Sequence, residues 1–163
     1  TVTIDRIRVN VSTAGSAGNR MRLAFYTSNQ NPADEMTENF LLPYQKIANT
    51  EFEFDTSTTG VKELVITTGF PQLNAGELYW VATQNNNVGA TMPILSAPSP
   101  TAHPIIGNSA TSFTSMTFQL SLPATTYGVL PSTLTTTDWS NLSSSALLRY
   151  SVQVRLQSII SHS

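Results

Sequence analysis

The fold of this chain is decided by residues 55–83, DTSTTGVKELVITTGFPQLNAGELYWVAT. Two apolar runs rich in β-branched and aromatic residues, 61–67 and 78–83, lie in this stretch, and each follows a turn of Gly and small polar residues. Runs of this length and composition, bounded by turn residues, are typical of buried β-strands. The stretch therefore predicts two strands, which we expect to pair with each other in antiparallel orientation.

A first strand is predicted over residues 2–11, VTIDRIRVNV. From Ile7 to Val11 every second residue is apolar, which places these apolar side chains on one face of a strand. Ile4 is out of phase with them. A β-bulge near Asp5 is the expected cause, because one extra residue in a strand restores the phase.

A hairpin is expected to follow this strand. Residues 13–19, TAGSAGN, have the composition of a tight loop, and residues 20–26 return as a strand with apolar residues on one face. We therefore predict that residues 2–11 and 20–26 pair directly. Their outward positions hold four arginines: Arg6, Arg8, Arg20 and Arg22.

Further strands are predicted at residues 40–47, 51–55, 92–95, 113–122 and 148–156, with irregular regions over 96–109 and 123–141. Seven or eight strands without helical stripes predict an all-β fold. The expected architecture is a two-sheet antiparallel β-sandwich, jelly-roll-like, forming a single domain over residues 1–163. The last strand alternates most cleanly, so we expect it to pair centrally, beside the first strand.

The composition argues against two classes of function, nucleic-acid binding and membrane insertion. Only 11% of the 163 residues are charged, and the net charge is -2. Hydroxyl and amide side chains are therefore expected on the surface in place of charged ones. A surface of this kind suits extracellular β-proteins and components of particles. The eight Lys and Arg residues are scattered along the chain rather than gathered, which argues against nucleic-acid binding. There is no run of about 18 apolar residues, so no membrane span is predicted.

The chain contains no cysteine, which excludes disulfides, cysteine-ligated zinc and thiol catalysis. A protein that is assembled in a reducing cytoplasm and released afterwards has no need of disulfides. A phage virion component is assembled and released in this way. The chain also starts at Thr1 within a strand pattern and without a signal peptide, so we expect a mature or excised domain whose upstream partner is absent here.

Histidine, the commonest acid–base catalyst, occurs twice. His103 lies in a Pro-rich loop and His162 is the penultimate residue. Neither has a carboxylate or hydroxyl partner at a recognisable spacing, so both are interpreted as surface residues rather than members of a catalytic triad.

A stripe of carboxylates, Glu51, Glu53 and Asp55, alternates with two phenylalanines. Residues two apart on a strand lie roughly 6.5–7 Å from each other, a separation that an inverting glycosidase pair also uses. The same pattern results from a solvated strand face with ion pairs to Arg20 or Arg22, and we favour this interpretation. Calcium binding is not supported, because no Asp-rich loop of the right spacing occurs. We predict no enzymatic activity, no cofactor and no metal.

Aromatic residues outside strands are the best candidates for binding. Trp80 lies within the strongest strand and is predicted to pack in the core. Trp139 lies in the polar segment 135–141, TTTDWSN, where it either anchors the loop or contacts a glycan or a partner. Tyr44 is a weaker candidate. The predicted binding residues, all in the two irregular regions, are Trp139, Tyr127, Asp138 and His103.

Several segments resemble the β-sandwich domains of tailed-phage tail fibres and other virion appendages. The resemblance is carried by residues 4–7 (IDRI), 11–18 (VSTAGSAG), 22–26 (RLAFY), 55–63 (DTSTTGVKE) and 75–82 (AGELYWVA). It covers the first half of the chain in detail and the second half only in strand spacing.

The resemblance implies that the chain is part of a longer, homotrimeric appendage protein of the virion, assembled in the host cytoplasm beside other virion proteins. It displays this domain outward to bind a glycan or protein on the host surface through loops at the sandwich ends. The family shares no catalytic motif, so no active residue transfers. Two alternatives stay open. One is a purely structural virion component, such as a capsid or tail decoration or an oligomerising connector. The other is an esterase or glycosidase that uses the 51–55 stripe or His103.

Overall fold

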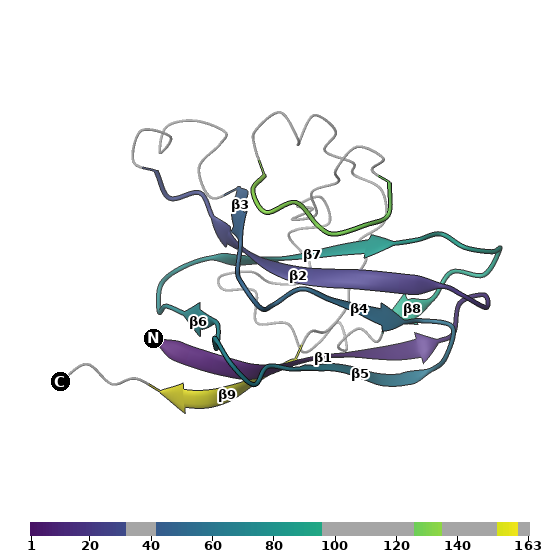
Figure 1. The fold of residues 1–163 in the computed structure, drawn as a ribbon, viewed down its shortest axis with the longest axis horizontal. Coiled ribbons are helices and arrows are strands. Elements are labelled where there is room, and N and C mark those ends of the chain that lie inside the picture. Colours follow the sequence, from purple (N-terminus) through teal and green to yellow (C-terminus); the bar gives the residue numbers. More distant parts are fainter. Residues whose placement is uncertain (32–41, 96–125, 135–152, 160–163) are drawn as a thin grey trace, which may run out of the picture.

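The structure is a computed structural model that describes residues 1–31, 42–95, 126–134 and 153–159. The described residues form nine strands and no helix. The strands are β1 (Val2–Thr13), β2 (Arg20–Ser28), β3 (Pro43–Lys46), β4 (Phe52–Asp55), β5 (Gly60–Val65), β6 (Gln72–Leu73), β7 (Tyr79–Asn85), β8 (Ile94–Leu95) and β9 (Gln153–Ile159). They lie in two antiparallel sheets that face each other (Figure 1). The prediction of an all-β, two-sheet sandwich is confirmed.

Each sheet is built around one long strand. In sheet A, β5, β6, β8 and β9 all pair with β1, and in sheet B, β3, β4 and β7 all pair with β2. The chain changes sheet after β1, β4, β6 and β7. The prediction that the terminal strand lies beside the first is confirmed, since Val2 of β1 is opposite Ile159 of β9. Residues 148–152 of that predicted strand, and the whole predicted strand 113–122, lie outside the described residues.

Two predicted pairings are wrong. β5 and β7, the strands of the 55–83 stretch, pair with β1 and β2 respectively, not with each other. The predicted hairpin of residues 2–11 and 20–26 is also absent, because the loop after β1 crosses from sheet A to sheet B. Small polar residues suit a sheet-to-sheet crossing as well as a hairpin. The choice between them depends on which apolar faces pack together, which is a non-local property.

The predicted bulge in β1 is confirmed. Ile4 lies opposite Leu156 and Arg6 lies opposite Arg155, so Asp5 is the extra residue and the register shifts there. Ile4 and Ile7 are three apart in sequence, yet both are fully buried. The bulge thereby turns both isoleucines inward and leaves Asp5 free to point outward.

The main core fills the space between the sheets. It takes the inward residues of β1 and β2 and the aromatic side of β4, where the rings of Phe52 and Phe54 are 5.1 Å apart. Its buried members are Ile4, Ile7, Val9, Val11, Leu23, Phe25, Phe54, Ile66 and Leu95. The inward faces predicted for the first two strands and for residues 51–55 are confirmed by this cluster.

A second cluster lies on the outer side of sheet B. Ala24 and Tyr26 of β2 are buried there against Leu130 and Leu134, and Trp80 of β7 packs on them. β2 is therefore buried on both faces. Trp80 packs in a core, as predicted, but in this outer cluster rather than between the sheets.

Candidate functional site

Of the four predicted binding residues, only Tyr127 is described. Trp139, Asp138 and His103 lie outside the described residues. The Tyr127 hydroxyl donates a hydrogen bond to Glu53 Oε2 at 3.1 Å, and the guanidinium carbon of Arg22 lies 5.6 Å from its ring centroid. Burial and the bond to Glu53 raise the pKa of Tyr127 to about 12. The described contacts of Tyr127 therefore hold it against sheet B.

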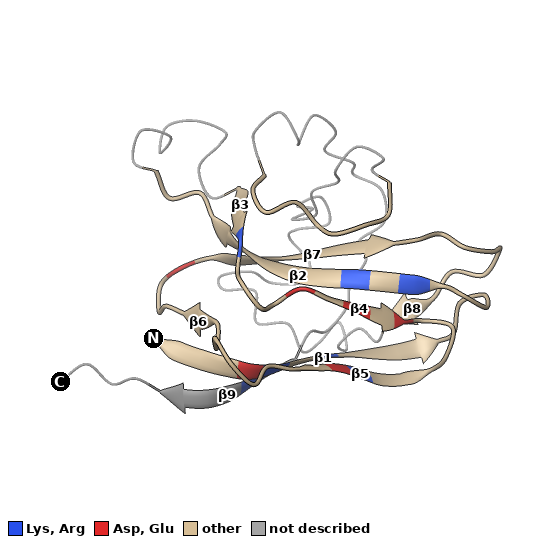
Figure 2. Ribbon diagram, in the orientation of Figure 1, with Lys and Arg blue, Asp and Glu red and all other residues tan. Residues whose placement is uncertain are grey.

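The carboxylate stripe of residues 51–55 forms the ion pairs that the favoured interpretation predicted, but its two glutamates are not solvated, since their side chains are only 15% and 26% exposed. Arg20 Nη1 lies 2.8 Å from Glu53 Oε1, and Arg22 reaches both Glu51 (3.1 Å) and Glu53 (2.9 Å). Lys46 Nζ contacts Glu51 Oε2 at 2.5 Å. These five residues, which we call the ion-pair face, lie on the outer side of sheet B, where Figure 2 shows blue and red segments on neighbouring strands.

The ion-pair face holds both glutamates ionised. The hydrogen bond from Arg20 is the largest cause that lowers the pKa of Glu53. Burial alone would raise the pKa of Glu51, but hydrogen bonds from Lys46, the Leu130 amide and Arg22 outweigh it and lower that pKa. An inverting carboxylate pair needs one acid with a raised pKa. Neither glutamate has one, so the pair does not fit that role.

A covering segment, residues 126–134, is fastened over this face. Glu51 Oε1 accepts from the Leu130 amide at 2.9 Å, and Lys46 Nζ donates to the Leu130 carbonyl at 2.6 Å. The Tyr26 hydroxyl donates to the Pro131 carbonyl at 2.5 Å. Both backbone groups of Leu130 are therefore satisfied by side chains, which allows an irregular segment to lie on a sheet. The charged groups of Glu51 and Lys46 thus bind the covering segment.

A second feature gathers three connections at one end of the sandwich. We call it the loop platform, and it consists of residues 14–19, 56–59 and 86–93. Its centre is Asn19, which is fully buried: its Nδ2 donates to the Val88 carbonyl (3.1 Å) and its Oδ1 accepts from the Thr56 hydroxyl (2.7 Å). One side-chain amide thus joins all three connections. This role leaves no signal in the sequence, because Asn in a small-residue loop is also an ordinary turn residue.

The platform connections also bond to one another through the backbone. Ser16 N donates to the Thr91 carbonyl at 3.0 Å, and Gly15 N donates to the Thr56 carbonyl at 2.9 Å. Gly89 has a φ of +80°, and a Cβ there would lie 2.2 Å from the Ser16 Cβ, so only glycine allows the two loops to come this close. The platform is therefore a fixed surface.

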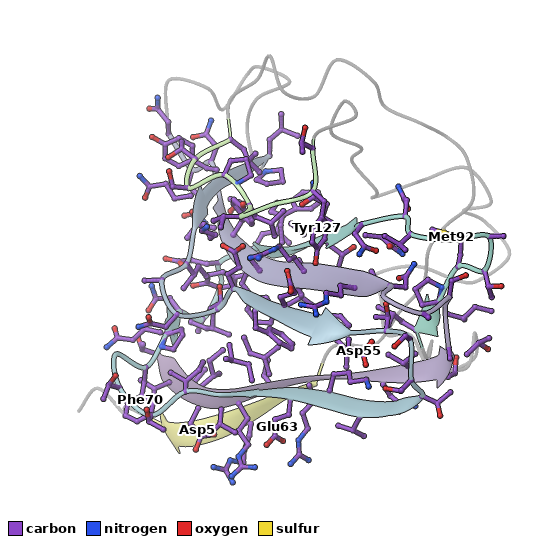
Figure 3. The ribbon with its side chains drawn as sticks, turned by 45° about the vertical axis from the view of Figure 1, so that its right-hand side comes forward. Asp5, Asp55, Glu63, Phe70, Met92 and Tyr127 are labelled. Carbon is purple, nitrogen blue, oxygen red and sulfur yellow. The ribbon has the colours of Figure 1, made fainter. Side chains whose placement is uncertain are left out.

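The platform faces away from the ends of the described chain. β1 runs from Val2 to Thr13 and ends at the platform, while Ile159 of β9 lies beside Val2. A strand of this length spans roughly 35 Å, and Figure 1 shows the N-terminus and the end of β9 at one end and the loops after β1 and β4 at the other. Val88 and Met92 of the platform are 43% and 50% exposed, and Figure 3 shows Met92 at this end.

Other kinds of site receive no support from the described residues. Within residues 1–31, 42–95, 126–134 and 153–159, no three His, Cys, Asp or Glu residues gather as a metal site would require. None of the described residues belongs to a helix long and apolar enough to cross a membrane. Comparison with known proteins found no matching family model, no matching curated protein and no matching solved structure.

Proposed function

We propose that this chain is a β-sandwich domain of a tailed-phage virion appendage, a tail fibre or a similar part, which binds a glycan or protein on the host surface. The observation that carries the proposal is the loop platform. A rigid surface of three connections lies at the end of the sandwich that is remote from both Thr1 and Ile159. An appendage domain must present its binding loops away from the point where it joins the rest of the particle.

The surface chemistry agrees with this role. Recognition of a sugar by preformed loops requires little net charge and no cofactor, and the chain has 11% charged residues. A single shallow site binds weakly, but three copies in a homotrimer and many appendages per virion multiply the effect. The partners in this proposal are two further copies of the chain, other virion proteins and the host surface.

The test is binding of the purified chain to intact bacteria and to an array of bacterial glycans. Host-selective binding is expected. Two variants locate the binding site. Met92→Asp on the platform and Trp139→Ala in the predicted binding loop should each reduce binding with little change in melting temperature. Leu78→Asp is the matched control, because Leu78 is 44% exposed and precedes Tyr79, at the end of β7 that lies away from the platform. Absence of binding to every strain and glycan would refute the proposal, and light scattering tests the trimer.

A purely structural role is the second candidate, and one observation favours it. Among the described residues β5 pairs only with β1, and Val61 and Val65 on it are 63% and 49% exposed. An open strand edge with exposed valines can join another chain. However, Lys62 lies opposite the buried Val9, on the inner face of β5, and an inward lysine on an edge strand opposes such pairing. Association of copies without host binding would favour this alternative.

A further inference from the structure

We propose that the outer face of sheet A binds an anionic polysaccharide, whose carboxylate groups are held by Arg8 and Arg155. This inference deepens the proposed function and rests on it, since it names the class of surface glycan. The site lies on a sheet face rather than on the loop platform. It consists of Asp5, Arg6, Arg8, Glu63 and Arg155, which we call the guanidinium face.

The strand register places these side chains together. Arg6 is opposite Arg155 of β9, and Arg8 is opposite Glu63 of β5. The bulge adds the carboxylate of Asp5 to the same face, beside Arg155. Figure 3 shows Asp5 and Glu63 on the side of sheet A that points away from sheet B.

The guanidinium face holds a surplus of cations. Three guanidinium groups meet two carboxylates, which leaves one positive charge in a chain whose net charge is -2. The ion-pair face of sheet B also sets three cations, Arg20, Arg22 and Lys46, against the two carboxylates of Glu51 and Glu53. It differs in access, because the covering segment lies on it and bonds to Glu51 and Lys46. Of these two charged faces of the described residues, the guanidinium face is the one without such a covering segment.

The two carboxylates hold the arginines without using all their donors. Glu63 accepts from Arg6 Nη1 at 2.8 Å and from Arg8 Nε. Asp5 accepts from Arg155 Nε at 2.7 Å and from its Nη2. The described bonds of Arg8 leave both its Nη groups free, and those of Arg155 leave Nη1 free. The two side chains are 45% and 55% exposed. Oriented guanidinium groups with outward donors suit carboxylates, since such charge-assisted bonds are strong.

The neighbouring side chains favour a sugar polymer as the carrier of the carboxylates. Val65 lies opposite Arg6, and Val61 lies opposite Asn10, so both exposed valines border the guanidinium face. They offer apolar contact to the C–H face of a pyranose ring. A nucleic acid is a poorer fit, because binding to it rests on many Lys and Arg contacts to phosphates, and the three arginines of this face, two of them balanced by carboxylates, supply few.

The experiment measures binding of the full chain to immobilised polygalacturonic acid, a polyuronate, and to dextran, a neutral polymer. The wild-type chain is expected to bind the polyuronate at low ionic strength and not to bind dextran. Arg8→Gln/Arg155→Gln should weaken this binding at least about tenfold. Arg20→Gln is the matched control, because Arg20 is 60% exposed and has one carboxylate partner on sheet B. It should stay within about twofold of wild type.

A second variant removes none of the charged residues of the guanidinium face. Val65→Glu adds a competing carboxylate to the guanidinium face and should weaken binding by the same factor. Wild-type affinity in both variants, no binding to the polyuronate, or equally tight binding to duplex DNA would overturn the inference. The glycan array separates this failure from failure of the proposed function. If the chain binds neutral glycans but not polyuronates, the proposed function stands and only this inference is lost. If it binds nothing, both are lost.

Discussion

Replacing Asn19 by alanine should destabilise the protein by an amount that can be worked out from two hydrogen bonds. The variant removes the bond to the Thr56 hydroxyl and the bond to the Val88 carbonyl. Each contributes about 1 kcal/mol net to the free energy of unfolding. The Thr56 hydroxyl is fully buried and loses its partner, which adds about 0.5–1 kcal/mol more. The expected loss is therefore about 2.5 kcal/mol.

This loss should lower the melting temperature by about 5–10 °C for a chain of this size. Urea denaturation gives the free energy directly, and the slope of the transition should stay unchanged. Native-state hydrogen exchange should quicken at the Ser16 and Thr56 amides, whose acceptors belong to the other platform connections. The effect would thus be largest at the loop platform.

A double-mutant cycle isolates the Asn19–Thr56 bond. Thr56→Val alone should cost about 1–1.5 kcal/mol, because it leaves Asn19 Oδ1 buried without its donor. In the Asn19→Ala background the same change should cost almost nothing, so the coupling is about 1 kcal/mol or more. Thr58→Val is the control, since Thr58 is exposed in the same turn. A loss below about 0.5 kcal/mol for Asn19→Ala, or additive effects in the cycle, would refute Asn19 as the centre of the platform.

Three further predictions concern the sheets. Tyr26→Phe should cost about 1–2 kcal/mol in urea denaturation by removing the bond to Pro131, and a change below about 0.3 kcal/mol would contradict a role in fastening the covering segment. Ile7→Ala should lower the free energy of unfolding by about 2–5 kcal/mol, while Val61→Ala, at an exposed position, should change it by no more than about 0.5 kcal/mol. Equal losses would contradict the assignment of Ile7 to the core and of Val61 to the surface. Because the pKa of Glu51 is lowered in the folded state, its contribution is present above the ordinary value of 4.5 and is lost as the pH falls through the lowered value. The stability difference between wild type and Glu51→Gln should therefore shrink below pH 4.5, and a constant difference would argue against an ionised Glu51.

The sequence predicted those features of the fold that depend on neighbouring residues. Alternation with a period of two places apolar side chains on one face of a strand, so the buried faces of β1, β2 and β4 could be assigned in advance. The break in that period at Ile4 was enough to place the bulge at Asp5. A pattern of this kind identifies a strand and its buried side, but not the strand beside it. That is why the pairings expected for β5 and β7 were wrong.

In the two sites as well, features set by neighbouring residues were predictable and features set by distant residues were not. The ion pairs between Arg20, Arg22 and the glutamates were predictable, because alternating strands present their charges on outer faces. The covering segment was not, since it has no periodic pattern and its polar contacts come from residues far away in sequence. The role of Asn19 was hidden for the same reason. Its partners Thr56 and Val88 lie 37 and 69 residues further along the chain.

The two sheets use their few charges for different purposes, and ionic strength can separate these purposes. On sheet B the glutamates are largely buried beneath residues 126–134, with Glu51 15% exposed, so salt screens their ion pairs only weakly. On sheet A the outward groups of Arg8 and Arg155 are open to water, so their attraction for a distant anion is screened. Added salt should therefore leave the unfolding free energy nearly constant while it weakens polyuronate binding. If binding and stability instead fell together, the charges of sheet A would serve the fold alone.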